Sequence, residues 1–172
     1  MSRSRTRHTG ALILASAFGL GLSPVGPGTC GALLGVVIHW LIVRLASPDL
    51  VAAAVALALV AVCTVHWLLT PFAVSYWQHR DPRHFVLDEV AGYLVVPLVC
   101  PAMTGWREML AGFVLFRALD IVKVPPARQI DRRMTGAAGI LLDDLVSGVF
   151  AGAVLCGWLH WAGHPLMWPP RG

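Results

Sequence analysis

The chain has 172 residues, of which 57% are hydrophobic and 13% charged, and its mean hydropathy is +0.71. Soluble domains contain about 25% charged residues, so this composition favours a membrane protein, and the length fits one domain, 1–172, with one functional site. The formal net charge is +4, but no basic face with interleaved aromatic residues follows the first arginines, so we expect contact with anionic lipid and no nucleic-acid partner.

Arginines at positions 3, 5 and 7 give residues 1–10 the character of a basic cytoplasmic tail. The next segment, Ala11–Leu22, is short and rich in glycine for a membrane crossing. We predict that it is an interfacial or re-entrant helix leading into the loop at 23–29.

Three stretches are apolar over a length close to the about 20 residues that one crossing needs, and we predict that each is a helix. They are Gly31–Ala46, Leu50–Val74 and Leu145–Ala162. A fourth apolar region, Val90–Leu119, is interrupted by two prolines and a polar turn, and forms either two short crossings or one broken helix. The sequence therefore predicts an all-α, multi-spanning membrane protein with about four to five transmembrane or re-entrant helices, followed by a carboxyl-terminal tail at 164–172.

If the fourth region crosses twice and the amino terminus is cytoplasmic, the polar segments 75–89 and 120–144 are also cytoplasmic. The positive-inside rule favours this orientation, because ten basic residues then lie inside and three outside. The inside group is Arg3, Arg5, Arg7, Arg80, Arg83, Arg117, Lys123, Arg128, Arg132 and Arg133. Seven of the nine acidic residues fall on or near the same face, namely Asp81, Asp88, Glu89, Asp120, Asp131, Asp143 and Asp144.

Two acidic doublets, Asp88-Glu89 and Asp143-Asp144, each follow an apolar pair and precede a glycine, at a point where a polar loop leads into an apolar helix. A carboxylate inside a spanning helix costs about 2.5–3.5 kcal/mol, so four of them need an explanation. Helix capping explains one acid per helix. A shared site for Mg²⁺ or Mn²⁺ explains both doublets better, because oxygen ligands select hard cations. We favour the metal site and leave capping open.

A charged triplet, Arg117, Asp120 and Lys123, has i, i+3 spacing and therefore lies close to one helical face. It is either a salt-bridged stripe or a phosphate site in which the two cations hold phosphate and Asp120 joins the metal site or acts on water. The loop Gly-Pro-Gly-Thr at 26–29 precedes a helix and can present backbone amides and the Thr29 hydroxyl to an anion. Such a loop alone is more often only a turn.

Several other chemistries are disfavoured. The four cysteines stand singly and the seven histidines show no paired-ligand spacing, so zinc is not expected. The chain also has no Asp-x-Asp nucleophile motif, no histidine-centred lipid phosphatase signature and no repeated aspartate motif of CDP-alcohol transferases.

These motifs together resemble the A-type phosphatidylglycerophosphatase family from about residue 19 to residue 148. Four blocks carry the resemblance: 21–31 with Gly28 and Thr29, 81–92 with the first doublet, 116–123 with the charged triplet, and 139–148 with the second doublet. Two positions depart from the family pattern. Val124 stands where proline usually follows the lysine, and Ala137 stands where a second glycine is usual.

The resemblance implies an all-helical enzyme of the bacterial inner membrane, with its site facing the cytoplasm, that uses Mg²⁺ to hydrolyse phosphatidylglycerophosphate to phosphatidylglycerol and phosphate. It implies metal binding by Asp88, Glu89, Asp143 and Asp144, catalysis by Asp120, Asp144, Arg117 and Lys123, and substrate binding by Gly28, Thr29, Arg117 and Lys123. The alternatives are a small transporter or channel subunit with a cation-binding carboxylate cluster, or a non-catalytic membrane scaffold.

Overall fold

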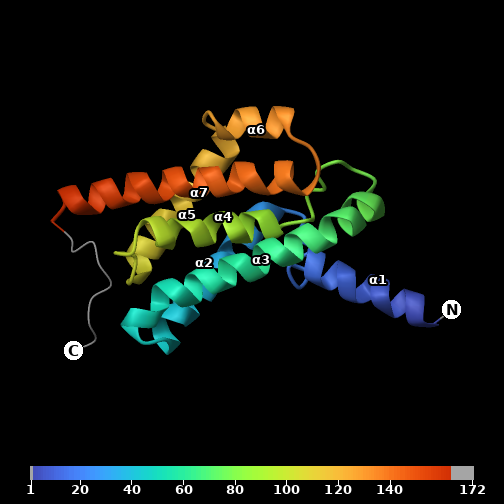
Figure 1. Ribbon diagram of the computed structural model, residues 1–172, viewed down its shortest axis with the longest axis horizontal. Coiled ribbons are helices and arrows are strands. Elements are labelled where there is room, and N and C mark those ends of the chain that lie inside the picture. Colours follow the sequence, from blue (N-terminus) through green and yellow to red (C-terminus); the bar gives the residue numbers. More distant parts are fainter. Residues whose placement is uncertain (1, 164–172) are drawn as a thin grey trace.

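The computed structural model describes residues 2–163, and within this range it contains only helices and connecting loops (Figure 1). The all-α prediction is therefore confirmed. The elements are α1 (Ser2–Ala15), η1 (Leu20–Leu22), α2 (Pro27–Leu45), α3 (Pro48–Trp77), α4 (Leu87–Val99), α5 (Trp106–Val122), α6 (Ala127–Arg133) and α7 (Gly136–Trp161). The predicted tail at 164–172 lies outside the described residues.

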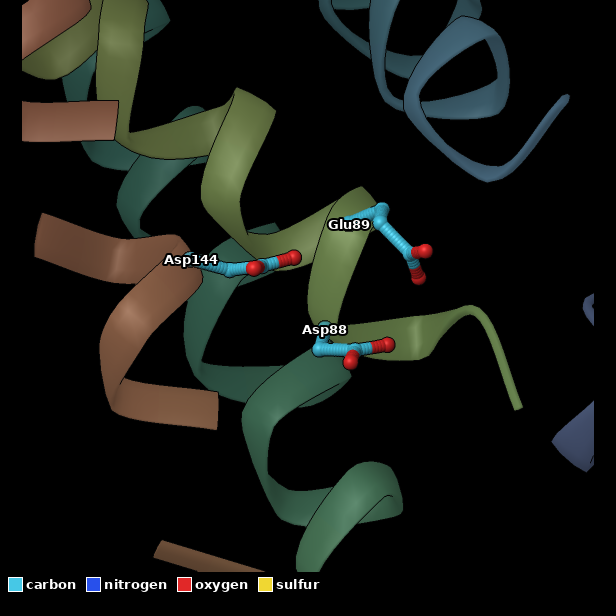
Figure 2. Close-up of side chains that lie close together, drawn as sticks. All are labelled: Asp88, Glu89 and Asp144. Carbon is cyan, nitrogen blue, oxygen red and sulfur yellow. The ribbon is translucent and has the colours of Figure 1, made fainter. Parts of the chain in front are cut away.

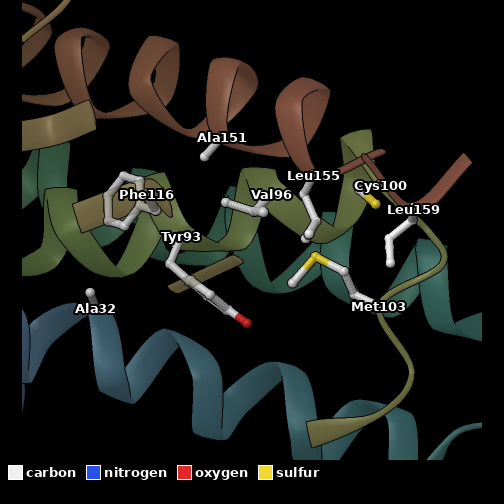
Figure 3. Packing of buried hydrophobic residues seen from close by; sticks show 9 residues of the cluster. All are labelled: Ala32, Tyr93, Val96, Cys100, Met103, Phe116, Ala151, Leu155 and Leu159. Carbon is white, nitrogen blue, oxygen red and sulfur yellow. The ribbon is translucent and has the colours of Figure 1, made fainter. Parts of the chain in front are cut away.

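The central helix is α4, against which α2, α3, α5 and α7 all pack. Ten of its 13 residues are buried, and a helix that is apolar on every side is one that other elements surround. Figure 3 shows the main core, where Tyr93 and Val96 of α4 meet Phe116 of α5 and Leu155 of α7. The central place of α4 matters because this helix carries the first acidic doublet.

Three helices, α2, α3 and α7, are long and apolar enough to cross a membrane. Each of these helices covers one predicted stretch, except that Ala46 and Ala162 fall just outside α2 and α7. All three helices begin earlier in the sequence than predicted. The fourth apolar region forms two helices, α4 and α5, so the two-helix version of that prediction is confirmed. At 13 and 17 residues, these two helices are shorter than the about 20 residues of a typical crossing.

The amino-terminal segment differs from the prediction. Residues 2–10, predicted as a tail, form the first part of α1, and the predicted helix over 11–22 is divided after Ala15. The division follows from Ser16, whose hydroxyl donates to the Leu12 carbonyl oxygen and accepts from the Gly19 amide. Such side-chain hydrogen bonds offer the backbone an alternative to the helix.

The segment 120–144 is more helical than predicted. α5 continues to Val122, α6 follows, and α7 begins at Gly136 instead of near Leu145. The prediction placed a boundary at the acidic pair, whereas the preceding residues 137–142 are good helix formers apart from Gly139. Asp143 and Asp144 therefore lie about two turns inside α7.

Candidate active site

Asp88 and Asp144 meet because α4 and α7 run side by side in the same direction (Figure 1). A Cβ on Gly148 of α7 would overlap the carbonyl oxygen of Gly92 of α4, so the backbones of the two helices touch there. Asp88 and Asp144 each lie four residues, or one turn, before these glycines. The glycine that follows each doublet thus brings the two doublets to the same height.

Three carboxylates converge at this point. Oxygen atoms of Asp88, Glu89 and Asp144 lie within 4.8 Å of one another, and Figure 2 shows Asp144 reaching from α7 toward the start of α4. The side chains of Asp88 and Asp144 are buried. One oxygen of each of the three residues is buried and accepts no hydrogen bond from any residue between 2 and 163.

Three carboxylates this close to one another repel, and two of them are buried while Glu89 is half-buried. Burial, followed by the charges of Glu89 and Asp144, raises the pKa of Asp88 well above its ordinary value. Burial also raises the pKa of Glu89 to about 7. A group of this kind is stabilised either by protons or by a cation. Its oxygen-only donors and its buried oxygens without hydrogen bonds fit a hard divalent cation.

Helix capping does not account for the cluster. Asp88 and Glu89 are in the first turn of α4, but no side chain makes a capping hydrogen bond there. Asp144 lies in the interior of α7, where no capping position exists.

Arg117 and Asp120 of α5 border the carboxylates. Arg117 Nη1 donates to Asp120 Oδ2 over 2.6 Å, so these two members of the triplet form an ion pair, one of the two alternatives for the triplet. The Asp120 carboxylate lies close enough to Asp144 for the two charges to repel, and the Arg117 charge attracts the Glu89 carboxylate. Arg117 Nε is buried and has no hydrogen-bond partner among the described residues. The guanidinium thus pairs with Asp120 of its own helix and lies near Glu89 of α4 and the first turn of α2.

Lys123 and Asp143 form a second ion pair, which the sequence did not indicate. Lys123 ends α5 in the left-handed conformation, and its Nζ lies 2.6 Å from Asp143 Oδ2. Adjacent helical residues point about 100° apart, so α7 directs Asp144 toward α4 and Asp143 toward the end of α5. Asp143, predicted as a metal ligand, lies outside the three-carboxylate group, and Lys123, the third member of the triplet, pairs across to α7.

The predicted anion loop also lies at this site. α2 begins at Pro27, so Gly28 and Thr29 occupy its first turn, where backbone amides lack partners within the helix. A Cβ on Gly28 would overlap Glu89 Oε1 and lie 3.1 Å from Arg117 Nη2. The amino terminus of α2 therefore lies directly against the side chains of Glu89 and Arg117, beside the carboxylate group. A helix amino terminus and a guanidinium both favour an anion at such a position.

The chain matches known proteins over nearly its whole length. The family model described as phosphatidylglycerophosphatase A matches residues 13–159. Phosphatidylglycerophosphatase A of Escherichia coli strain K12 is 34% identical over 157 residues, which cover 91% of this chain and 84% of that protein. The Haemophilus influenzae protein of the same name is 30% identical over 149 residues, covering 87% and 88%.

A Bacteroides thetaiotaomicron protein, provisionally named a phosphatidylinositol-3-phosphatase, is 31% identical over 141 residues, covering 81% of this chain and 87% of that protein. No solved structure matches the chain.

Proposed function

Because this chain belongs to the phosphatidylglycerophosphatase A family, we propose that it is a magnesium-dependent membrane hydrolase acting on phosphatidylglycerophosphate. Hydrolysis breaks the terminal bond between phosphorus and the glycerol oxygen. Water supplies a hydroxyl group to the phosphorus and a proton to that oxygen, so that the products are inorganic phosphate and phosphatidylglycerol. The observation that carries this proposal is the group of three carboxylates, two buried and one half-buried, beside the Arg117 guanidinium. Each has a buried oxygen that accepts no hydrogen bond from the described residues.

Asp88, Glu89 and Asp144 would hold the cation. When bound, Mg²⁺ supplies charge that polarises the phosphoryl group and makes a water molecule more acidic. An all-carboxylate donor set suits Mg²⁺ or Mn²⁺ better than Zn²⁺.

The phosphate would be bound by Arg117 and by the first turn of α2. A guanidinium can donate two parallel hydrogen bonds to phosphate oxygens, and the Gly28 and Thr29 amides add donors at the positive end of a helix. Asp120 orients Arg117 through the 2.6 Å ion pair. Asp120 or Asp144 would accept a proton from the attacking water.

The position of the site suits a lipid headgroup. The acids gather at one end of the bundle, where α2, α4 and α7 begin and α5 ends. A cation pathway through the membrane would instead distribute acids along the depth of the helices. This arrangement supports the lipid phosphatase over a transporter or channel subunit.

We propose that this end faces the cytoplasm of a bacterial inner membrane. Among the residues with described side chains, seven basic residues lie at the site end and two, Arg44 and Arg107, at the other. The seven are Arg80, Arg83, Arg117, Lys123, Arg128, Arg132 and Arg133. In a cysteine-free background, Arg132→Cys should react only with a membrane-permeant thiol reagent, and Ser47→Cys, between α2 and α3, should also react with an impermeant one.

The function is tested with detergent-purified protein by measuring phosphate release from phosphatidylglycerophosphate, phosphatidic acid and phosphatidylinositol 3-phosphate. Each lipid is assayed with Mg²⁺, with Mn²⁺ and with a chelator. Release that is fastest from phosphatidylglycerophosphate and depends on the cation supports the proposal. Absence of release from all three lipids with either cation contradicts it.

A further inference from the structure

An apolar groove of about 280 Å³ runs between α2 and α5. Its α2 wall contains Leu33, Val37 and Trp40, and its α5 wall contains Trp106, Leu110 and Phe113. Leu33, Val37 and Leu110 are each 45–50% exposed. Two of them belong to α2, which is a candidate membrane-spanning helix. The groove thus opens toward the surface where bilayer lipid is expected.

Both walls of the groove continue to the candidate phosphate site. Thr29 lies four residues before Leu33 on α2, and Arg117 lies four residues after Phe113 on α5. Residues four apart share a helical face, so each wall continues along its own helix to a phosphate-binding group. The helical rise places the groove about 6 Å from Arg117 and gives it a length of about 10 Å.

The site closes the groove at one end, because the first turn of α2 approaches the Arg117 side chain. The residues that line the groove have apolar side chains. The groove therefore suits the apolar part of a lipid whose phosphate is bound at Arg117. We propose that the α2–α5 groove binds one acyl chain of the lipid whose phosphate is held at Arg117. This inference rests on the proposed function.

The groove contributes orientation more than hydrophobic free energy. Lipid tails outside the groove are as apolar as its leucine side chains, so moving an acyl chain into it gains little from burial. An ordered chain instead fixes the position of the headgroup against the carboxylates, and small displacements of a reacting group cost large factors in rate.

The first test compares two variants. Leu110→Trp on α5 fills the groove, whereas Val154→Trp adds the same side chain at a 52% exposed position of α7, which does not line it. Each is assayed on dioleoyl and on dihexanoyl phosphatidylglycerophosphate in detergent. We expect the ratio of kcat/KM for the long-chain lipid over the short-chain lipid to fall about tenfold in Leu110→Trp and to stay at the wild-type value in Val154→Trp. An unchanged ratio in Leu110→Trp overturns the proposal.

A second measurement uses the wild-type protein, so that it does not depend on how the variants fold. Phosphatidic acid with a diazirine in one acyl chain is photolysed with the protein in the presence of a chelator, and labelled peptides are identified by mass spectrometry. We expect labels on Leu33, Val37 and Leu110 that decrease when dioleoyl phosphatidylglycerophosphate is added. Labels spread over all lipid-facing helices, or absent from the groove because a second copy covers it, overturn the proposal.

The two proposals fail separately. Competed labelling in the groove without phosphate release from any lipid would reject the phosphatase and support the groove. Phosphate release with the same chain-length ratio in wild type and Leu110→Trp would support the phosphatase and reject the groove.

Discussion

Gly148 lies against Gly92 so closely that a Cβ on Gly148 would overlap the Gly92 carbonyl oxygen. This contact brings α7 against α4 one turn from the position where Asp88 and Asp144 meet. Small residues allow membrane helices to approach at the distance that their backbones permit. The spacing of the carboxylate group is therefore set by two residues that have no side chain.

Gly148→Val should separate α4 from α7 and weaken both stability and activity. We expect destabilisation of about 1–3 kcal/mol from overpacking, seen as a lower melting temperature in detergent, together with slower phosphate release. Gly157→Val is the matched control, because a Cβ at Gly157 of the same helix meets nothing within 4 Å. Equal melting temperatures for the two variants would contradict this account of the contact between α4 and α7.

Asp144→Asn should weaken cation binding and phosphate release together. It removes one charge from a three-carboxylate group, and we expect the rate to fall at least about a hundredfold, as for the loss of other preorganised electrostatic groups. Mn²⁺ binding is measured by electron paramagnetic resonance, and activity by phosphate release. Asp49→Asn, at an exposed acid in the first turn of α3, should change neither quantity. Wild-type Mn²⁺ affinity in Asp144→Asn would remove this residue from the metal site.

Removal of the cation should abolish activity and lower the melting temperature, because the three carboxylates lose a bound ligand and their repulsion is then relieved only by proton uptake. Added Mg²⁺ should restore both. Asp144→Asn should show the opposite stability effect in chelator, melting above the chelated wild type, since one of the repelling charges is gone. Melting curves that are the same with Mg²⁺ and with chelator would argue against a structural cation at this position.

Lys123→Met should be more harmful to stability than Lys123→Met combined with Asp143→Asn. The single change leaves the Asp143 carboxylate, whose side chain is only 5% exposed, without its lysine. We expect a cost of about 1–3 kcal/mol, which the neutral asparagine should partly recover. Melting temperatures of the wild type, both single variants and the double variant complete the cycle. Additive shifts would mean that the ion pair contributes no coupling energy.

Gly28→Ala should slow phosphate release while the fold persists. The added Cβ would overlap Glu89 Oε1 and crowd Arg117, which displaces a proposed metal ligand and the proposed phosphate-binding guanidinium at once. We expect a loss of about tenfold or more, because small misplacements of reacting groups have large effects on rate. Gly157→Ala, which meets no neighbour within 4 Å, is the control. Full activity of Gly28→Ala would place the first turn of α2 outside the site.

The class of fold and the residues of the candidate site can be predicted from the sequence alone. Apolar stretches close to the length of a crossing predict helices, because a helix pairs its own backbone N–H and C=O groups where the bilayer offers no water. The doublets at 88–89 and 143–144 and the charged triplet on α5 could be recognised because acids and bases are costly in such helices. The glycine after each doublet was visible as well, although its role as a helix contact was not.

The division of these residues between the carboxylate group and the ion pairs depends on tertiary packing. The sequence placed both members of each doublet in one metal group, whereas helical geometry directs Asp144 to α4 and Asp143 to Lys123. The pairing of Lys123 with Asp143 spans 20 positions and depends on where α5 ends and α7 begins, boundaries that local patterns do not fix. Contacts between helices far apart in the chain arise from packing, and packing also places Gly28 against Glu89 and Arg117.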